Sequence, residues 1–495
     1  MNATVITKEE KKTLWSVIAA SSVGTLIEWY DFYIFGSLAT ILSQQFFPQT
    51  NPTAAFLSTL ATFAAGFVVR PFGAIVFGRL GDMVGRKYTF MVTLILMGGS
   101  TLAIGLVPSY NSIGVFAPII VLILRLLQGL ALGGEYGGAA TYVAEHAPAA
   151  RRGYYTSFIQ TTATLGLFVS IGVILLVRHW VGVEAFSSWG WRIPFLLSSV
   201  LVGVSIFIRL RMNESPLFAK LKAEGKVSKN PLKESFGKKE NLIMVLIALF
   251  GATAGQGVVW YTGQFYAMTF LEKTCLVDFV QTRDIIAISL LIGTPFFVVF
   301  GGWSDRVGRK YIMMVGMLLA IFLYRPIYSE MMNLTSLSRK VELTDQRTEE
   351  RISSDSNSAG EKLIQKRVYA DETRATVTVV DNKETIQDVL LGGSTYWIMI
   401  ALITVQVLLV TMVYGPIAAF LVELFPTRIR YTSMSLPYHI GNGIFGGLTP
   451  FIATYLAVTY NDPLAGLWYP IGVASVCFVI GMLLLSNKKR AEVMD

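Results

Sequence analysis

Long apolar runs, separated by short polar segments, recur along the whole chain. A run of about 18 or more apolar residues can cross the roughly 30 Å hydrocarbon core of a bilayer as a helix. The pattern therefore predicts an all-α membrane protein with twelve spans, at about 14–44, 53–78, 89–107, 113–137, 154–177, 193–208, 241–270, 284–303, 311–330, 395–421, 432–457 and 466–486.

The composition agrees with this interpretation. Hydrophobic residues make up 53% of the 495 residues, and charged residues only 15%. A soluble protein of this length needs more charge to cover its surface. The 44 glycines are typical of membrane helices, because small residues let neighbouring helices approach closely.

The net charge of +9 indicates orientation rather than a nucleic-acid partner. With the N-terminus inside, 25 of the 41 Lys and Arg fall in the terminal tails and the predicted inner loops. The short outer loops hold only Arg178, Arg192, Lys273 and Arg283. Positive residues accumulate on the cytoplasmic side of membrane proteins. We therefore expect a multi-pass protein of the cell (inner) membrane with both termini in the cytoplasm.

Two polar loops are near copies of each other. Residues 78–88 read GRLGDMVGRKY, and residues 301–311 read GGWSDRVGRKY. A second pair, at 145–152 and 423–430, shares a Glu, a Pro three residues later and two arginines. Such self-similarity indicates a duplicated unit.

The duplication defines the expected domains. An N-terminal six-helix bundle covers residues 1–212, and a pseudo-symmetric C-terminal bundle covers residues 241–495. A basic cytoplasmic linker at 213–240 joins them.

The second unit contains an insertion. Asp82 and Glu145 are 63 residues apart, whereas Asp305 and Glu423 are 118 apart, an excess of 55. The excess matches a polar stretch at about 334–392, which the topology places outside the cell. We expect a solvated, partly ordered decoration that a short linker can replace, and its Val/Thr run at 374–380 is suited to a short hairpin.

The repeated loops resemble the signature of the major facilitator superfamily, G-x-x-x-D-x-x-G-R-[RK]. A closer resemblance comes from GTLIEWYDFY at 24–33, RPFG at 70–73, RLLQG at 125–129, GGEYGG at 133–138 and WGWRIPF at 189–195. Together these motifs are similar to the metabolite:proton symporter family, whose members take up organic acids or zwitterionic osmolytes. The resemblance covers the chain except the insertion, and it implies proton-coupled symport by alternating access.

Two acidic residues lie in the middle of the first span. Glu28 and Asp31 are three residues apart and so share one helical face. Ionisable residues at membrane depth are costly and are kept for a purpose. Neighbouring carboxylates repel each other, which raises the proton affinity of at least one. We expect Asp31 to carry the coupled proton, while Glu28 either shares that role or pairs with an arginine.

Arginines in two neighbouring spans are candidate substrate contacts. Arg125 and Gln128 share a face of the fourth span, and Arg70 lies in the second. A guanidinium stays charged and offers a planar fork suited to carboxylates. Arg125 therefore anchors a substrate carboxylate or neutralises an acid such as Asp31 or Glu135. Glu135 itself is a further proton-coupling candidate, or a packing or gating partner.

The second half holds no such charged cluster. Its candidates for contact with a substrate are neutral: Gln256, Trp260, Tyr261, Gln264, Tyr266, Gln406, Tyr414, His439 and Asn442. Tyr30 in the first span joins them as a substrate-binding candidate. We expect coupling chemistry in the first half and recognition of substrate shape in the second.

The resemblance also implies a latch between the halves on the inner side. Its members are Asp82, Arg86, Glu145, Arg152, Asp305, Arg309, Glu423 and Arg430. Position in the chain places Asp82 and Asp305 near the N-termini of the third and ninth helices, where negative charge is favoured. The latch would stabilise the outward-open state and release as the halves rock.

Other classes of protein fit less well. The sequence shows no nucleotide-binding loop, metal cluster or nucleophile constellation, so we expect neither an enzyme nor a cofactor nor a metal. The expected partners are a small-molecule substrate, protons and membrane lipid, with the chain acting as a monomer. A sugar-type porter or facilitator is the alternative within transporters. A solute sensor on a transporter fold is the alternative outside them.

Overall fold

A computed structural model describes residues 8–84, 86–134, 140, 143–144, 146–210, 231–352, 362–380, 383–425 and 430–486. Within these residues the helices follow the twelve predicted spans in order. Several spans are bent or interrupted, so one span often consists of two or more helical segments.

The first half contains six helical rods. The successive elements are α1 (Lys8–Ser37) with α2 (Ala39–Phe46), α3 (Pro52–Val68) with α4 (Arg70–Val84), α5 (Arg86–Leu106), α6 (Tyr110–Ile113) with α7 (Phe116–Gly133), η1 (Ala149–Arg151) with α9 (Arg152–Val181), and α10 (Val183–Ala185), η2 (Phe186–Gly190) and α11 (Arg192–Leu210).

The second half repeats this plan after α13 (Pro231–Phe236). Its rods are α14 (Lys239–Ala248), η3 (Leu249–Thr253), α15 (Ala254–Tyr261), η4 (Thr262–Tyr266) and α16 (Ala267–Lys273), then α17 (Phe279–Gly293) with α18 (Pro295–Val307), α19 (Arg309–Thr335), α20 (Gly393–Tyr414) with α21 (Ile417–Leu424), α22 (Arg430–His439), η7 (Ile440–Gly446) and α23 (Thr449–Thr459), and η8 (Ala465–Leu467) with α24 (Trp468–Leu484).

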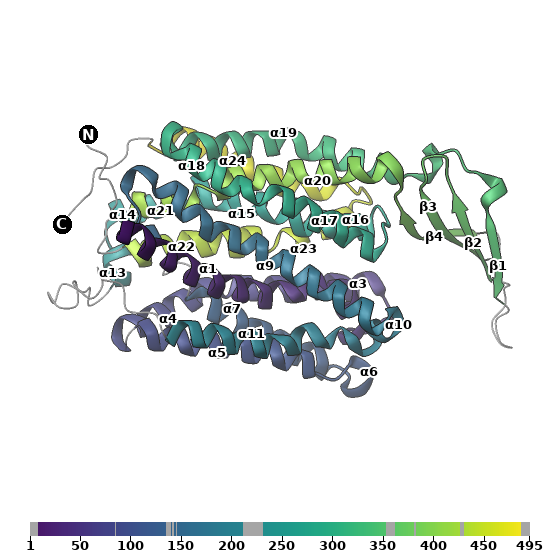
Figure 1. Ribbon diagram of the computed structural model, residues 1–495, viewed down its shortest axis with the longest axis horizontal. Helices are drawn as coiled ribbons and strands as arrows, with labels where there is room; N and C mark the ends of the chain where they lie inside the picture. Colours follow the sequence, from purple (N-terminus) through teal and green to yellow (C-terminus); the bar gives the residue numbers. More distant parts are fainter. Residues whose placement is uncertain are drawn as a thin grey trace.

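The two halves lie side by side, with their helices along the long axis of the molecule (Figure 1). Helices α4, α5, α7 and α11 form one side, and α18, α19, α20 and α24 form the other. The start of α1 and the end of α24 lie at one end of the bundle, which we call the terminal end. A small β-sheet projects from the opposite end, which we call the sheet end.

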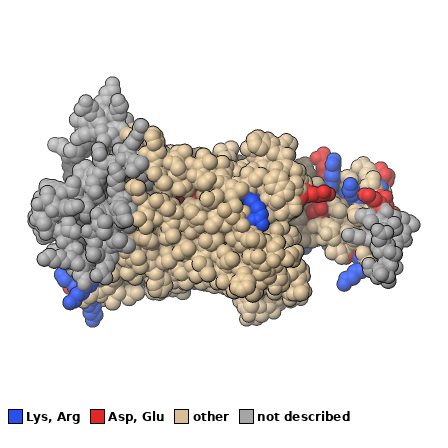
Figure 2. Space-filling model, turned by 90° about the horizontal axis from the view of Figure 1, so that it is seen from below, with Lys and Arg blue, Asp and Glu red and all other residues tan. Residues whose placement is uncertain are grey.

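The surface has the pattern of a membrane protein. Figure 2 shows a long face almost free of charged side chains, with charges at the two ends of the molecule. Among the described residues, eight helical stretches are long and apolar enough to cross a membrane, or nine if a pair bent by 61° around Trp191 counts as one span. The apolar stretch of the third rod is short, at Met91–Leu106.

Glycines bring the second and fourth rods into backbone contact. A Cβ added at Gly129 would lie 1.8 Å from the carbonyl oxygen of Gly66, and one at Gly133 would lie 2.1 Å from that of Arg70. Any side chain at Gly129 or Gly133 would therefore force these helices apart. The close packing fixes the positions of Arg70 and Arg125, which lie on the two helices.

The insertion is a folded four-stranded sheet, which is more extensive than the expected partly ordered decoration with a short hairpin. Strands β1 (Thr348–Ile352), β2 (Lys362–Val368), β3 (Arg374–Val380) and β4 (Lys383–Leu390) pair antiparallel in sequence order. The Val/Thr run is strand β3, with Ala375 and Val377 buried. Strands β2 and β4 are its two neighbours in the sheet, and neither was predicted from the sequence.

Candidate transport site and gates

At the terminal end, an acid of the second half caps a helix of the first. Asp305 on α18 accepts hydrogen bonds from the backbone N–H groups of Gly153 and Tyr154, each at 2.9 Å. These N–H groups lie in the first turn of α9, where a helix offers them no partner. A carboxylate also complements the positive end of the helix dipole. Asp305 therefore joins the halves through charge-assisted bonds.

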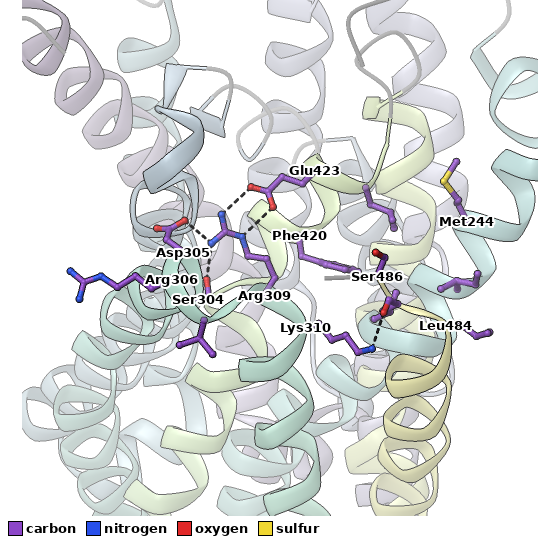
Figure 3. A pocket seen from close by; sticks show the side chains of 15 residues that line it. Met244, Ser304, Asp305, Arg306, Arg309, Lys310, Phe420, Glu423, Leu484 and Ser486 are labelled. Atoms are coloured by element: carbon purple, nitrogen blue, oxygen red, sulfur yellow. Dashed lines mark hydrogen bonds and ion pairs between the residues drawn. The ribbon is translucent and has the colours of Figure 1, made fainter. Parts of the chain in front are cut away.

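The same acid belongs to a network of charged side chains (Figure 3). Arg309 Nη1 lies 2.6 Å from Asp305, and Arg309 Nη2 lies 2.9 Å from Glu423. Arg152, from the first half, reaches Glu423 at 3.7 Å. Burial raises the strength of such contacts, because water screens them less. This part of the predicted latch therefore links the two halves.

Asp305 lies near the end of α18, four residues before Arg309 begins α19, the ninth rod, as its position in the chain predicts. It also caps α9, the fifth rod, which the sequence analysis did not predict. The reason is tertiary: a Cβ at Gly153 would lie 2.5 Å from the carbonyl oxygen of Gly301. This close crossing of α9 and α18 brings the N-terminus of α9 to the carboxylate.

The first copy of the latch remains a prediction. Glu135 and Glu145 lie outside the described residues. Asp82, Arg86 and Arg430 lie in α4, α5 and α22, but the description does not extend to their side chains.

We expect Asp305→Asn to open the terminal end. Asparagine keeps one carbonyl acceptor but loses the charge that faces Arg309 and the two N–H donors. Hydrogen bonds to charged groups contribute about 1.5–3 kcal/mol each, so we expect the open population to rise at least about tenfold. Spin-label distances across the terminal end measure this. Asp462→Asn, which removes the charge from an exposed cap on Leu464, is the matched control, and an equal effect there would contradict a specific latch.

The two acids of the first span are buried in α1. Glu28 is 2% exposed and Asp31 is 1% exposed. One carboxyl oxygen of Asp31, Oδ1, has no hydrogen-bond partner among the described residues. Buried polar atoms without a partner are rare and need an explanation. Asp31 therefore keeps an acceptor available inside the bundle.

Arg70 keeps one edge of its guanidinium unpartnered. The group is buried among aromatic rings, with Cζ 4.1 Å from the Phe67 ring centroid, 4.4 Å from that of Phe32 and 5.1 Å from that of Trp29. Its Nε and Nη2 atoms have no partner among the described residues. These two atoms form the side of the planar group that can bind a carboxylate with two parallel bonds.

Arg125 is more fully engaged than Arg70. Its Nη1 donates to Gln128 Oε1 at 2.7 Å, and its Nη2 donates to the carbonyl of Phe63 at 3.3 Å. Gln128 in turn donates to Thr101 at 2.6 Å. Arg125 and Gln128 therefore belong to a network inside the first half.

Arg70 faces the second half. The hydroxyls of Tyr261, Tyr33, Tyr438 and Tyr414 all lie within electrostatic reach of its guanidinium. Tyr414 and Tyr438 share a hydrogen bond of 2.7 Å between their hydroxyls. The unpartnered edge therefore lies in a polar region to which both halves contribute.

Aromatic rings join the halves around this region. Tyr33 stacks on Trp260 with ring centroids 5.4 Å apart, and Phe67 meets Tyr261 edge to face at 5.0 Å. Tyr30 differs from these residues, because its hydroxyl donates to the carbonyl of Pro194 within the first half.

The second half adds amide groups at irregular turns. Gln256 and Asn442 exchange hydrogen bonds of 3.0 and 2.8 Å. Both amide atoms of Gln264 and Nε1 of Trp260 are buried without a partner among the described residues. Gln264 and Asn442 lie in the π-helical turns η4 and η7, and such turns are frequent at functional sites. Of the predicted candidates, Trp260, Tyr261 and Tyr414 thus lie around the Arg70 region. Gln256 and Gln264 lie about one helical turn away from Trp260 along the same rod.

At the sheet end, the structure shows a gate that the sequence analysis missed. Arg283 on α17 binds Glu272 on α16 at 2.5 Å and donates to the carbonyl of Ser37 in the first half, also at 2.5 Å. Glu272 accepts a bond of 2.6 Å from Thr40, again in the first half. The sequence pattern identifies Arg283 only as one of the charges of the outer loops. The sequence did contain a signal for this gate, because the acid Glu272 lies just after one predicted span and the base Arg283 lies just before the next.

These contacts close the space between the halves at both ends of the bundle. Two helical halves that meet through separable gates, around buried polar groups at their centre, define a secondary active transporter of the alternating-access type.

Known proteins share this architecture and sequence. Residues 16–240 match the family model described as sugar (and other) transporter. The inner membrane metabolite transport protein YhjE of Escherichia coli is 33% identical over 96% of this chain and 94% of its own. The alpha-ketoglutarate permease of E. coli is 30% identical over 96% and 94%. The proline/betaine transporter of E. coli is 28% identical over 96% of this chain and 84% of its own.

Solved structures agree on the fold. The xylose transporter XylE of E. coli, in a partially occluded inward-open conformation, aligns with a TM-score of 0.66 at 15% identity, covering 97% of this chain and 99% of that one. The chain belongs to the major facilitator superfamily and, within it, to the family of metabolite transport proteins. It is therefore a multi-pass membrane transporter of small molecules and not an enzyme.

Proposed function

We propose that this protein takes up a small metabolite that carries a carboxylate, together with protons. The observation that carries the proposal is the unpartnered Nε/Nη2 edge of Arg70, buried between the halves. A carboxylate bound there would satisfy both donors with two parallel charge-assisted bonds. The neighbouring tyrosines and Gln264 offer further contacts to the rest of the substrate.

The relatives support this class of substrate. These relatives are named for alpha-ketoglutarate and for proline and betaine, each of which carries a carboxylate. An organic acid and a zwitterion differ in whether a positive group accompanies the carboxylate. The rings of Trp260 and Tyr261 suit such a group, because aromatic faces attract cations.

Asp31 is the proposed proton carrier, with Glu28 as its neighbour and Glu135 as a further candidate. The support is the burial of the Asp31 carboxyl group in α1 and its unpartnered Oδ1. Arg125 and Gln128 line the proposed site on the side of the first half and belong to the hydrogen-bond network there. We also propose that the chain acts as a monomer in the inner membrane, with the termini and the latch in the cytoplasm. The charge asymmetry of the loops supports this orientation.

Uptake into proteoliposomes tests the proposed function. We expect accumulation of a labelled carboxylic acid or betaine when the outside is acidic, and loss of accumulation with a protonophore. A preference for a neutral sugar would overturn the substrate class and favour the sugar-type porter. Specific binding without any accumulation would instead indicate a solute sensor.

A further inference from the structure

The β-sheet is joined to the connection between α16 and α17. Val389 of β4 donates its N–H to the carbonyl of Leu276 at 2.8 Å and accepts from the N–H of Asp278 at 3.0 Å. Val277 and Val389 thereby form a parallel bridge. The connection therefore pairs with the sheet through the carbonyl of Leu276 and the N–H of Asp278, while the N–H of Val277 bonds to the carbonyl of Leu271 in α16.

A glutamine side chain completes the junction. Gln281, in the first turns of α17, donates from Nε2 to the carbonyl of Leu391 at 2.7 Å and accepts from the N–H of Leu391 at 2.7 Å. The amide of Gln281 thus makes the two hydrogen bonds to Leu391, directly after β4, that the backbone of a neighbouring strand would make. Gln281 and the bridge at Val277 fix the sheet to the connection and to the start of α17. We call these contacts the sheet junction.

The base of the sheet is also held to the helices that carry it. Asp371 accepts hydrogen bonds from Lys340, Thr373 and Thr395, so it joins the chain that follows α19 to the start of α20. Partial burial raises the pKa of Asp371, but these bonds outweigh that effect and hold the pKa below its usual value. The carboxylate therefore stays charged, and the sheet stays anchored, in mildly acidic surroundings.

The connection held by the sheet carries the gate at the sheet end. Glu272 lies just before it and Arg283 just after it, and these two residues make the contacts to Ser37 and Thr40 of the first half. Gln281 lies two residues from Arg283. The sheet junction therefore fixes the segment on which the closed gate depends.

We propose that the sheet is a clamp that stabilises the closed gate at the sheet end, with Gln281 as its positioning residue. Opening this end requires Arg283 and Glu272 to leave Ser37 and Thr40. A connection that is hydrogen-bonded to a folded sheet presents these side chains in the closed geometry, whereas a free connection samples many geometries. Relatives without such a sheet would have to hold this gate by other contacts.

The proposal concerns the balance between open and closed gates, so it does not depend on the substrate or on proton coupling. Two perturbations test it. Gln281→Leu keeps the size of the side chain but removes both bonds to Leu391. Replacement of residues 345–391 by a short Gly/Ser linker removes the sheet itself, together with its junction residues Val389 and Leu391. Gln365→Leu, at a glutamine within the sheet and away from the junction, is the matched control.

Distances between spin labels at Trp180 and Tyr460 report on the gate, in a background in which Cys275 and Cys477 are serine. Both positions are exposed, at the ends of α9 and α23 in opposite halves. We expect Gln281→Leu to raise the open population about tenfold, as the loss of two hydrogen bonds implies. We expect the linker variant to raise the open population at least as much. Gln365→Leu is expected to leave the distances between the spin labels unchanged.

The decisive measurement is the combination of the two changes. If Gln281 acts through the sheet, Gln281→Leu has no further effect once the sheet is gone. Additive effects would overturn the proposal, because Gln281 would then act on α17 alone. Unchanged distances in a folded linker variant would also overturn it, and folding is checked separately by size-exclusion chromatography and thermal unfolding.

Discussion

Replacing Asp31 with asparagine is expected to abolish proton-driven accumulation while leaving the protein folded. Asparagine has nearly the same size, so the packing of α1 is preserved. It cannot take up and release a proton, so the coupling step is lost. With an acidic exterior, the ratio of inside to outside substrate should fall from well above one to about one. Uptake of labelled substrate into proteoliposomes measures the ratio.

Exchange of substrate without a gradient separates coupling from folding. Asp31→Asn should still exchange labelled for unlabelled substrate, because exchange needs no net proton transfer. Asp284→Asn is the matched control, since it removes a partly buried carboxyl group from α17, outside the central cluster. If Asp31→Asn accumulates substrate normally and Glu28→Gln does not, the proton is carried by Glu28.

The second large effect is expected for Arg70→Lys and Arg70→Ala. A lysine ammonium is a point charge and does not reproduce the two parallel bonds of the Nε/Nη2 edge. Removing a desolvated charged partner of a carboxylate weakens the binding free energy by about 2–5 kcal/mol. This change corresponds to at least about thirtyfold weaker binding. Calorimetry or scintillation proximity on purified protein measures the affinity directly.

Arg125→Lys is the matched control for Arg70. Arg125 donates to Gln128 and to backbone carbonyls, and an ammonium can replace some of these bonds. We therefore expect weaker effects on affinity than at Arg70. If Arg125→Lys weakens binding thirtyfold while Arg70→Lys binds normally, Arg125 is the carboxylate anchor and the assignment made from the unpartnered atoms is wrong.

The comparison of Arg70 with Arg125 shows what the sequence left open. Both are arginines in apolar spans, and their spacing favoured Arg125 because it shares a helical face with Gln128. In the structure that same proximity engages Arg125 in a bond to Gln128, whereas the Nε and Nη2 atoms of Arg70 have no partner among the described residues. Hydrogen-bond partners depend on neighbours in space, which spacing along one helix does not reveal.

The sequence by itself determined the class of this protein. The lengths of the apolar runs predict membrane helices, the repeated loops predict two equivalent halves, and the acids and arginines at membrane depth mark the central cluster. These features are local, since they depend on the period of a helix, the thickness of a bilayer and the cost of burying a charge.

Only the tertiary structure decided how the halves meet. Asp305 caps a helix distant in the sequence, Arg283 reaches Ser37 across the halves, and the sheet binds the connection that carries the gate. Each contact joins residues separated by more than one hundred positions. Such contacts form only once the packing of the glycine-rich helices sets their relative positions, so no pattern within a single span could have predicted them.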